Sequence, residues 1–349
     1  MNFMKQTSTY YFNESFELEL GAYLPGFQLQ YTTSGKLNAE RDNVIWVCHA
    51  LTGSSDFTEW WGGLFSKEGI YSPDKYFIVC ANILGSCYGS TNAFSINPET
   101  GGIYFHDFPT LTNRDVVRAF DLLRMSLGIH SVHTLIGGSL GGQQVLEWAI
   151  QEPDVFEHII PIATNAVHSP WGIAFNEAQR MAIAADVTWK NKDYLAGTEG
   201  LKAARAIGML SYRTYDTYKQ TQAENSNNVT ETFKAATYQQ YQGIKLVKRF
   251  NAFAYWTLTK MMDSQQVGRD RSSIQDALKK IKAKTLVIGI DSDVLFPLTE
   301  QLFLAESIPH ADIAIIQSLY GHDGFLIEYD QLTKAITKFY QQAEVSTSK

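Results

Sequence analysis

Short apolar runs separated by helical patterns recur along most of the chain. The runs are compact and rich in valine and isoleucine, which is typical of parallel strands buried on both faces of a sheet. The clearest helical pattern spans residues 112–128; it begins with a capping-box sequence at Thr112 and ends at a glycine. This alternation predicts an α/β fold, a mostly parallel sheet flanked by helices. The strand-like runs are residues 44–49, 76–81, 132–136, 158–163, 285–290 and 313–316.

The alternation changes at two places. Residues 10–33 alternate polar and apolar side chains around a Pro-Gly turn, which predicts an antiparallel strand pair. Between residues 167 and 280 the strand signals stop, and an insertion of this length is too long for an ordinary loop. Its candidate helices are residues 176–185, 200–212 and 230–260. The predicted organisation is therefore a core (1–166), an inserted helical lid (167–280) and the rest of the core (281–349).

Composition narrows the class of protein. Of 349 residues, 45% are apolar and 19% charged, the balance of a soluble globular protein. A net charge of −7 without a basic block argues against a nucleic-acid partner. The three cysteines lack metal-ligand spacing and are interpreted as reduced thiols. Without a signal-like start or a run of about 20 apolar residues, we expect a cytoplasmic protein with no membrane partner and no metal.

A serine stands between one of these runs and a helical pattern. Gly-Gly-Ser-Leu-Gly at 137–141 follows the run at 132–136 and leads into a segment with helical spacing. This strand–turn–helix context is that of a nucleophile elbow, in which Ser139 would present its hydroxyl at the end of the sheet. The amide of Leu140, at a helix N-terminus, would then be available to an oxyanion.

A serine nucleophile needs a base and a carboxylate, and on such a sheet they follow it in the order acid, then histidine. His322 comes after the last strand-like run and is the candidate base. Asp291 and Asp293 both follow the run at 285–290, and spacing alone does not choose between them. The small-residue turn at 49–53 is suited to supply a second oxyanion donor, the Leu51 amide.

Taken together, these segments make the chain resemble the homoserine O-acetyltransferase family, acyltransferases of the α/β-hydrolase fold. The resemblance covers most of the chain, and the 82–91 loop is far more specific than the elbow. Five motifs carry it: Cys-His-Ala-Leu-Thr-Gly (48–53), Asn-Ile-Leu-Gly-Ser-Cys-Tyr-Gly-Ser-Thr (82–91), the elbow continued to Leu-Glu-Trp (137–148), Ser-Asp-Val-Leu-Phe-Pro (292–297) and Gly-His-Asp-Gly-Phe-Leu (321–326).

The resemblance implies roles that spacing could not assign. It selects Asp293 as the acid, and it implies that Asp323 holds the amino group of homoserine and Arg205 its carboxylate. It also implies acetyl-CoA as co-substrate without a permanently bound cofactor, a place in methionine biosynthesis, and a homodimer. The CoA-contacting residues are not identified.

The chain departs from the family pattern beside the elbow and in the 82–91 loop. Gln143 and Gln144 stand where the family commonly has Met-Gln, and Ser86 replaces a frequent glycine. These positions bear on pocket shape, so the acyl group and the acceptor stay open. The alternatives are an O-succinyltransferase acting on homoserine or serine, and a carboxylester hydrolase of the same fold.

Overall fold

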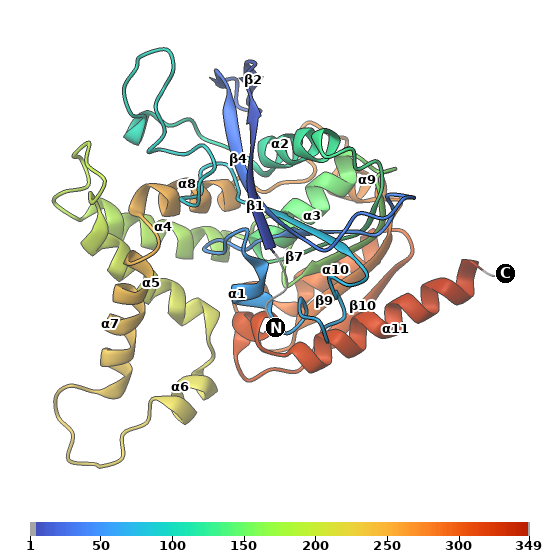
Figure 1. Cartoon of the computed structure of the whole chain (residues 1–349). Helices are drawn as coiled ribbons and strands as arrows, with labels where there is room; N and C mark the ends of the chain where they lie inside the picture. Colours follow the sequence, from blue (N-terminus) through green and yellow to red (C-terminus); the bar gives the residue numbers. More distant parts are fainter. Residues whose placement is uncertain (1–4, 348–349) are drawn as a thin grey trace.

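The computed structural model describes residues 5–347, which are built around an eight-stranded sheet (Figure 1). The strand order is β1-β4-β6-β5-β7-β8-β9-β10, and the strands from β6 to β10 run parallel. All six predicted runs are strands of this parallel part, with bounds within two residues of those expected. They are β5 (Val44–Cys48), β6 (Phe77–Ala81), β7 (Val132–Gly138), β8 (Phe156–Ile162), β9 (Lys284–Ile290) and β10 (Ala311–Ile316).

The predicted antiparallel pair forms the other edge of the sheet. β1 (Lys5–Phe12) pairs with β4 (Phe27–Ser34), and β4 in turn pairs antiparallel with β6. Between them, β2 (Phe16–Glu17) and β3 (Tyr23–Leu24) form a separate two-stranded ribbon. The pairing was predicted correctly, although β1 begins five residues before the predicted segment.

Helices cover both faces of the sheet because its central strands are apolar on both sides. In β5, Trp46 packs against one cluster of buried side chains and Val47 against the other. The first face carries α2 (Asn113–Ser126), α3 (Leu140–Gln151), α9 (Ile274–Leu278) and α10 (Leu298–Ser307); the second carries α1 (Phe57–Trp61) and α11 (Tyr329–Thr347). The capping box predicted at Thr112 is formed with Asp115.

Of the six helices between β8 and β9, the first five extend beyond the end of the sheet (Figure 1). They are α4 (Pro170–Ala184), α5 (Thr198–Tyr212), α6 (Tyr215–Thr221), α7 (Lys234–Val247) and α8 (Ala252–Asp263). The single helix predicted at 230–260 is wrong, because Asn251 caps the start of α8 and separates it from α7. α6 was not predicted. An antiparallel bridge between Val167 and Gln266 closes the base of this insertion.

The cysteines are free thiols, as the sequence suggested. Cys48 and Cys80 are buried, and burial raises the pKa of the partly exposed Cys87 to about 11. Among the helices of residues 5–347, none has the length and apolarity to cross a membrane.

The turn between β7 and α3 is strained and closely packed. Ser139 has φ 57° and ψ −122°, a conformation that is strained for a residue with a side chain. Its amide donates to the Ile162 carbonyl, and its carbonyl accepts from the Thr164 hydroxyl. A Cβ on Gly141 would lie 2.1 Å from the Cys48 carbonyl oxygen. Glycine is therefore required there, as the elbow motif implied.

We predict that Gly141→Ala destabilises the protein. Alanine in a helix normally gains up to about 1 kcal/mol over glycine, but here the new methyl group meets the backbone of β5, which cannot retreat. We expect a net loss of about 3 kcal/mol in the free energy of unfolding, measured by denaturant titration. Gly102→Ala is the matched control, since its Cβ would meet only a side-chain oxygen at 3.7 Å. Equal stability of the two variants would contradict the packing argument.

Candidate active site

Ser139 opens into a cavity between the sheet and the inserted helices. The core contributes Leu51, Thr52, His322, Asp323 and Phe325 to its lining. The insertion contributes Asn176 and Gln179 from α4, Arg205 and Tyr212 from α5, and Met262 from α8. Five of the seven predicted site residues therefore line one cavity; Leu140 adjoins Ser139, and Asp293 lies behind His322.

His322 and Asp293 form a buried pair beside Ser139. The Nδ1 atom of His322 lies 2.6 Å from Asp293 Oδ2, and both side chains are almost fully buried. The other oxygen of Asp293 accepts hydrogen bonds from the amides of Leu295 and Phe296. The ring of Phe296 stacks on His322. A carboxylate held in this way keeps the proton on Nδ1, so Nε2 can act as a base.

The structure distinguishes the two candidate acids. Asp291 lies at the end of β9 and accepts a hydrogen bond from the Ser318 amide. Asp293, the acid that the family resemblance selected, is the one that contacts His322. Asp291 thus holds the loop after β10 in place, while Asp293 orients the imidazole.

Ser139 and His322 share the cavity, although no hydrogen bond joins their side chains in the described part of the chain. Catalytic hydrogen bonds often tighten only when substrate is bound, so this arrangement is compatible with proton transfer. The amides of Leu51 and Leu140 donate to no other group within residues 5–347. Two free amides beside a serine are what stabilisation of an oxyanion needs.

His49 supports the turn that carries Leu51, a role that sequence reasoning missed. Its Nδ1–H donates to the Ala50 carbonyl, and its Nε2 accepts from the Ile83 amide at 3.1 Å. Complete burial lowers the pKa of His49 to about 4, so the ring is neutral and can accept that bond. The imidazole thereby joins the 48–53 turn to the 82–91 loop. A histidine directly after a buried strand was the available signal.

Charged groups face the cavity on the side of the inserted helices. The guanidinium of Arg205 lies 5.3 Å from the centre of the Tyr212 ring. Asp323 is mostly buried, and burial raises the pKa of its carboxyl group. Its ion-pair partner is Arg213, with Nε 2.8 Å from Oδ2. Arg213 was not predicted, because a contact between residues 110 positions apart leaves no pattern in one sequence.

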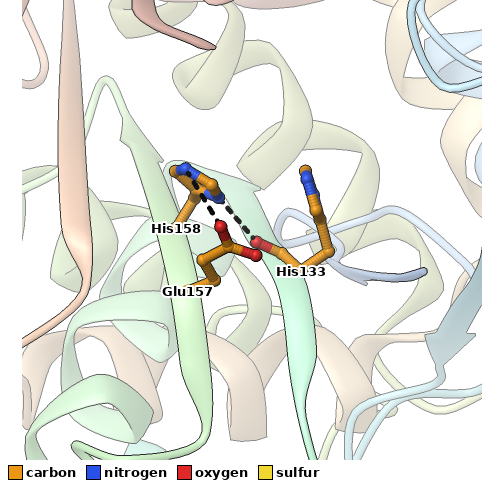
Figure 2. A group of neighbouring side chains, drawn as sticks. All are labelled: His133, Glu157 and His158. Carbon is orange, nitrogen blue, oxygen red and sulfur yellow. Dashed lines mark hydrogen bonds and ion pairs between the residues drawn. The ribbon is translucent and has the colours of Figure 1, made fainter. Parts of the chain in front are cut away.

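One further group of side chains lies at the end of the parallel strands that is opposite to Ser139. His133, Glu157 and His158, at the amino ends of β7 and β8, offer metal-ligand atoms within 4.8 Å of one another (Figure 2). His158 Nδ1 donates to the His133 carbonyl. The Lys284 side chain lines the same pocket, and its positive charge would repel a metal ion bound there. This group is remote from Ser139 and takes no part in chemistry at the cavity.

Known proteins are similar to this chain in sequence and in fold over nearly its whole length. The family model for the α/β-hydrolase fold matches residues 43–204. Homoserine O-acetyltransferase of Cyclobacterium marinum is 50% identical over 95% of the chain and 94% of its own length. The enzyme of that name from Trichormus variabilis is 47% identical, covering 98% and 96%. The chain belongs to the homoserine O-acetyltransferase family. Its fold is accordingly the α/β-hydrolase fold expected from the motifs.

Solved structures with the same fold include both transferases and esterases. Homoserine O-acetyltransferase from Bacillus anthracis superimposes with a TM-score of 0.89 at 24% identity, covering 97% of this chain and 98% of that one. Esterase E22 gives 0.87 at 22% identity, covering 96% and 100%. Likeness at this level extends to the fold alone. The fold alone therefore does not distinguish a transferase from an esterase.

We predict that Asp293 and Asp291 differ sharply in their effect on Ser139. A fluorophosphonate reacts with an activated serine whatever its natural substrate, so the labelling rate reports the triad directly. Asp293→Asn should slow labelling about 10³-fold or more, because an amide opposite Nδ1 favours the wrong tautomer of His322. Asp291→Asn, the matched control, should label within about threefold of the unaltered protein. Equal rates for the two variants would contradict the assignment.

Proposed function

We propose that the protein is a homoserine O-acetyltransferase that moves an acetyl group from acetyl-CoA to the hydroxyl of L-homoserine through an acetyl-Ser139 intermediate. The observation that carries the proposal is the combination in one cavity of Ser139 and His322 with Arg205 and Asp323. A hydrolase needs only the first pair. The cation and the carboxylate match the two charged ends of an amino acid.

In the first half-reaction, Nε2 of His322 takes the proton of the Ser139 hydroxyl. The serine oxygen attacks the thioester carbonyl, and the Leu51 and Leu140 amides hold the negative oxygen of the tetrahedral intermediate. As the intermediate collapses, the carbon–sulfur bond breaks and the CoA sulfur receives the proton from His322. The products are free CoA and acetyl-Ser139.

In the second half-reaction, L-homoserine binds with its carboxylate at Arg205 and its ammonium group at Asp323. His322, again neutral, takes the proton of the homoserine hydroxyl, and that oxygen attacks the acetyl carbonyl. The bond to Ser139 then breaks, and the serine oxygen recovers the proton from His322. O-Acetylhomoserine leaves, and the starting state is restored.

Water can also attack acetyl-Ser139, so the homoserine hydroxyl must be held close to the acetyl carbonyl in order to react first. We assign residues 167–280 the role of a lid, because α4, α5 and α8 supply much of the cavity wall. Anchoring both ends of homoserine raises the effective concentration of its hydroxyl well above that of an unanchored nucleophile. Excluding solvent also strengthens the hydrogen bonds to the oxyanion.

We also propose that the lid helices associate with a second copy of the chain to form a homodimer. Large apolar side chains on its helices face solvent, among them Met181 on α4, Leu210 on α5 and Ile244 on α7. Burying such side chains is a common basis of homodimers. A dimer should have twice the 39.3 kDa mass of the chain in a light-scattering measurement. We place the enzyme in the cytoplasm, in agreement with its three free thiols.

A matrix of donors and acceptors tests the proposed reaction. Acetyl-CoA and succinyl-CoA are each combined with L-homoserine, L-serine or no acceptor, and the products are identified by mass spectrometry. We expect O-acetylhomoserine as the main product, with homoserine accelerating CoA release at least about tenfold. Ser139→Ala should abolish transfer, because no acyl-enzyme can form.

Other outcomes of the matrix would identify the alternatives. Preference for succinyl-CoA would make the protein an O-succinyltransferase. Turnover of acetyl-CoA or simple esters that homoserine does not accelerate would make it a carboxylester hydrolase. Near-normal transfer by Ser139→Ala would overturn the covalent mechanism itself.

A further inference from the structure

Asp323, the residue proposed to hold the ammonium group of homoserine, already has a partner. Arg213 places Nε 2.8 Å from its Oδ2 atom, and about a fifth or less of either side chain is exposed. A mostly buried carboxylate is stabilised in its charged form by a nearby guanidinium. Asp323 lines the cavity, and its mostly buried pair with Arg213 is therefore not a chance contact on the surface.

Arg213 is held firmly in this position. It directly follows α5, and its guanidinium lies 5.3 Å from the centre of the Tyr320 ring. A short way along the chain from Arg213, the hydroxyls of Thr214 and Thr217 both donate to the Leu319 carbonyl. The segment that carries Arg213 is thus bound to the loop that carries His322 and Asp323.

Three charges meet at this side of the cavity: two arginines and one carboxylate. Arg205 and Arg213 both act on Asp323 and lower its pKa against the effect of burial. Within residues 5–347, Arg205 forms no ion pair with a carboxylate, and it faces the cavity beside Tyr212. Asp323 is thus paired with Arg213, while Arg205 keeps its charge available to a ligand.

We propose that Arg213 is a positioning residue that selects the amino-acid acceptor: by occupying Asp323 it keeps this carboxylate apart from Arg205. The two groups then remain separate receptors for the ammonium and carboxylate ends of the acceptor. This inference rests on the proposed function. Without Arg213, Arg205 is the remaining arginine that acts on Asp323, and a direct pair between them would occupy both receptors at once.

The pKa of Asp323 gives the arrangement a pH dependence. Burial raises this pKa, and Arg213 is the largest influence that lowers it; the other charged groups that act on it are Arg205 and His322. Removing Arg213 raises the pKa further, so Asp323 becomes protonated at a higher pH and loses the charge that attracts an ammonium group. Homoserine binding by an Arg213 variant should therefore weaken, relative to the unaltered enzyme, as the pH falls.

Arg213→Met tests the proposal in two separate measurements. Titration calorimetry with L-homoserine uses the Ser139→Ala background, which cannot turn over. Rapid-mixing kinetics with acetyl-CoA alone measures formation of the acyl-enzyme in the Ser139 protein. We expect Kd and KM for homoserine to rise about tenfold or more, while the burst of CoA release stays within about twofold. Arg213→Lys should recover part of the loss, because it restores the charge but not the guanidinium geometry.

Arg271→Met is the matched control, because Arg271 is another half-buried arginine paired with an acid, Glu147, that does not line the cavity. It should leave homoserine binding unchanged. If Arg213→Met loses the CoA burst together with homoserine binding, or behaves like Arg271→Met, the positioning role is wrong. If the unaltered enzyme shows neither a CoA burst nor homoserine binding, the proposed function has failed instead, and the inference fails with it.

Discussion

The strained backbone at Ser139 determines how the rest of the site is arranged. A residue with φ 57° and ψ −122° persists only where its surroundings hold it, and here β8, Thr164 and the close approach of α3 to β5 do so. The same contact leaves no room for a side chain at Gly141. The turn thereby holds the Ser139 hydroxyl and the Leu140 amide side by side, at the wall of the cavity that His322 also lines.

Around this turn, three buried titratable side chains have specific polar partners. His49 is buried without a charged partner, and its low pKa lets it act as a hydrogen-bond acceptor. Asp293 is equally buried, and its two carboxylate oxygens contact two backbone amides and the imidazole of His322. Asp323 depends on Arg213 in the same way. Each of these three buried side chains thus has a specific partner in a distant part of the chain.

The sequence predicted the parallel strands well, because compact apolar runs are a local signal. Local signals, a Gly-x-Ser-x-Gly turn and polar residues directly after strands, also pointed to Ser139 and His322, which the structure places in one cavity. Spacing could not show whether Asp291 or Asp293 is the acid, because both follow β9 within three residues. The two differ in the segment that each contacts. The break at Asn251 was missed because the helical pattern continues on both sides of it. His49 and Arg213 were missed because their roles arise from contacts between distant segments.

The bonds from Thr214 and Thr217 to the Leu319 carbonyl join the inserted helices to the loop that carries His322. In the proposed mechanism they would couple opening of the lid to the position of the general base. Lifting this edge of the lid would pull on the loop that positions His322. An acetyl-enzyme opened at this edge would therefore be exposed to bulk water at the moment when its general base is displaced. In such an arrangement the intermediate is protected from wasteful hydrolysis twice, by exclusion of water while the lid is closed and by loss of the base when it opens.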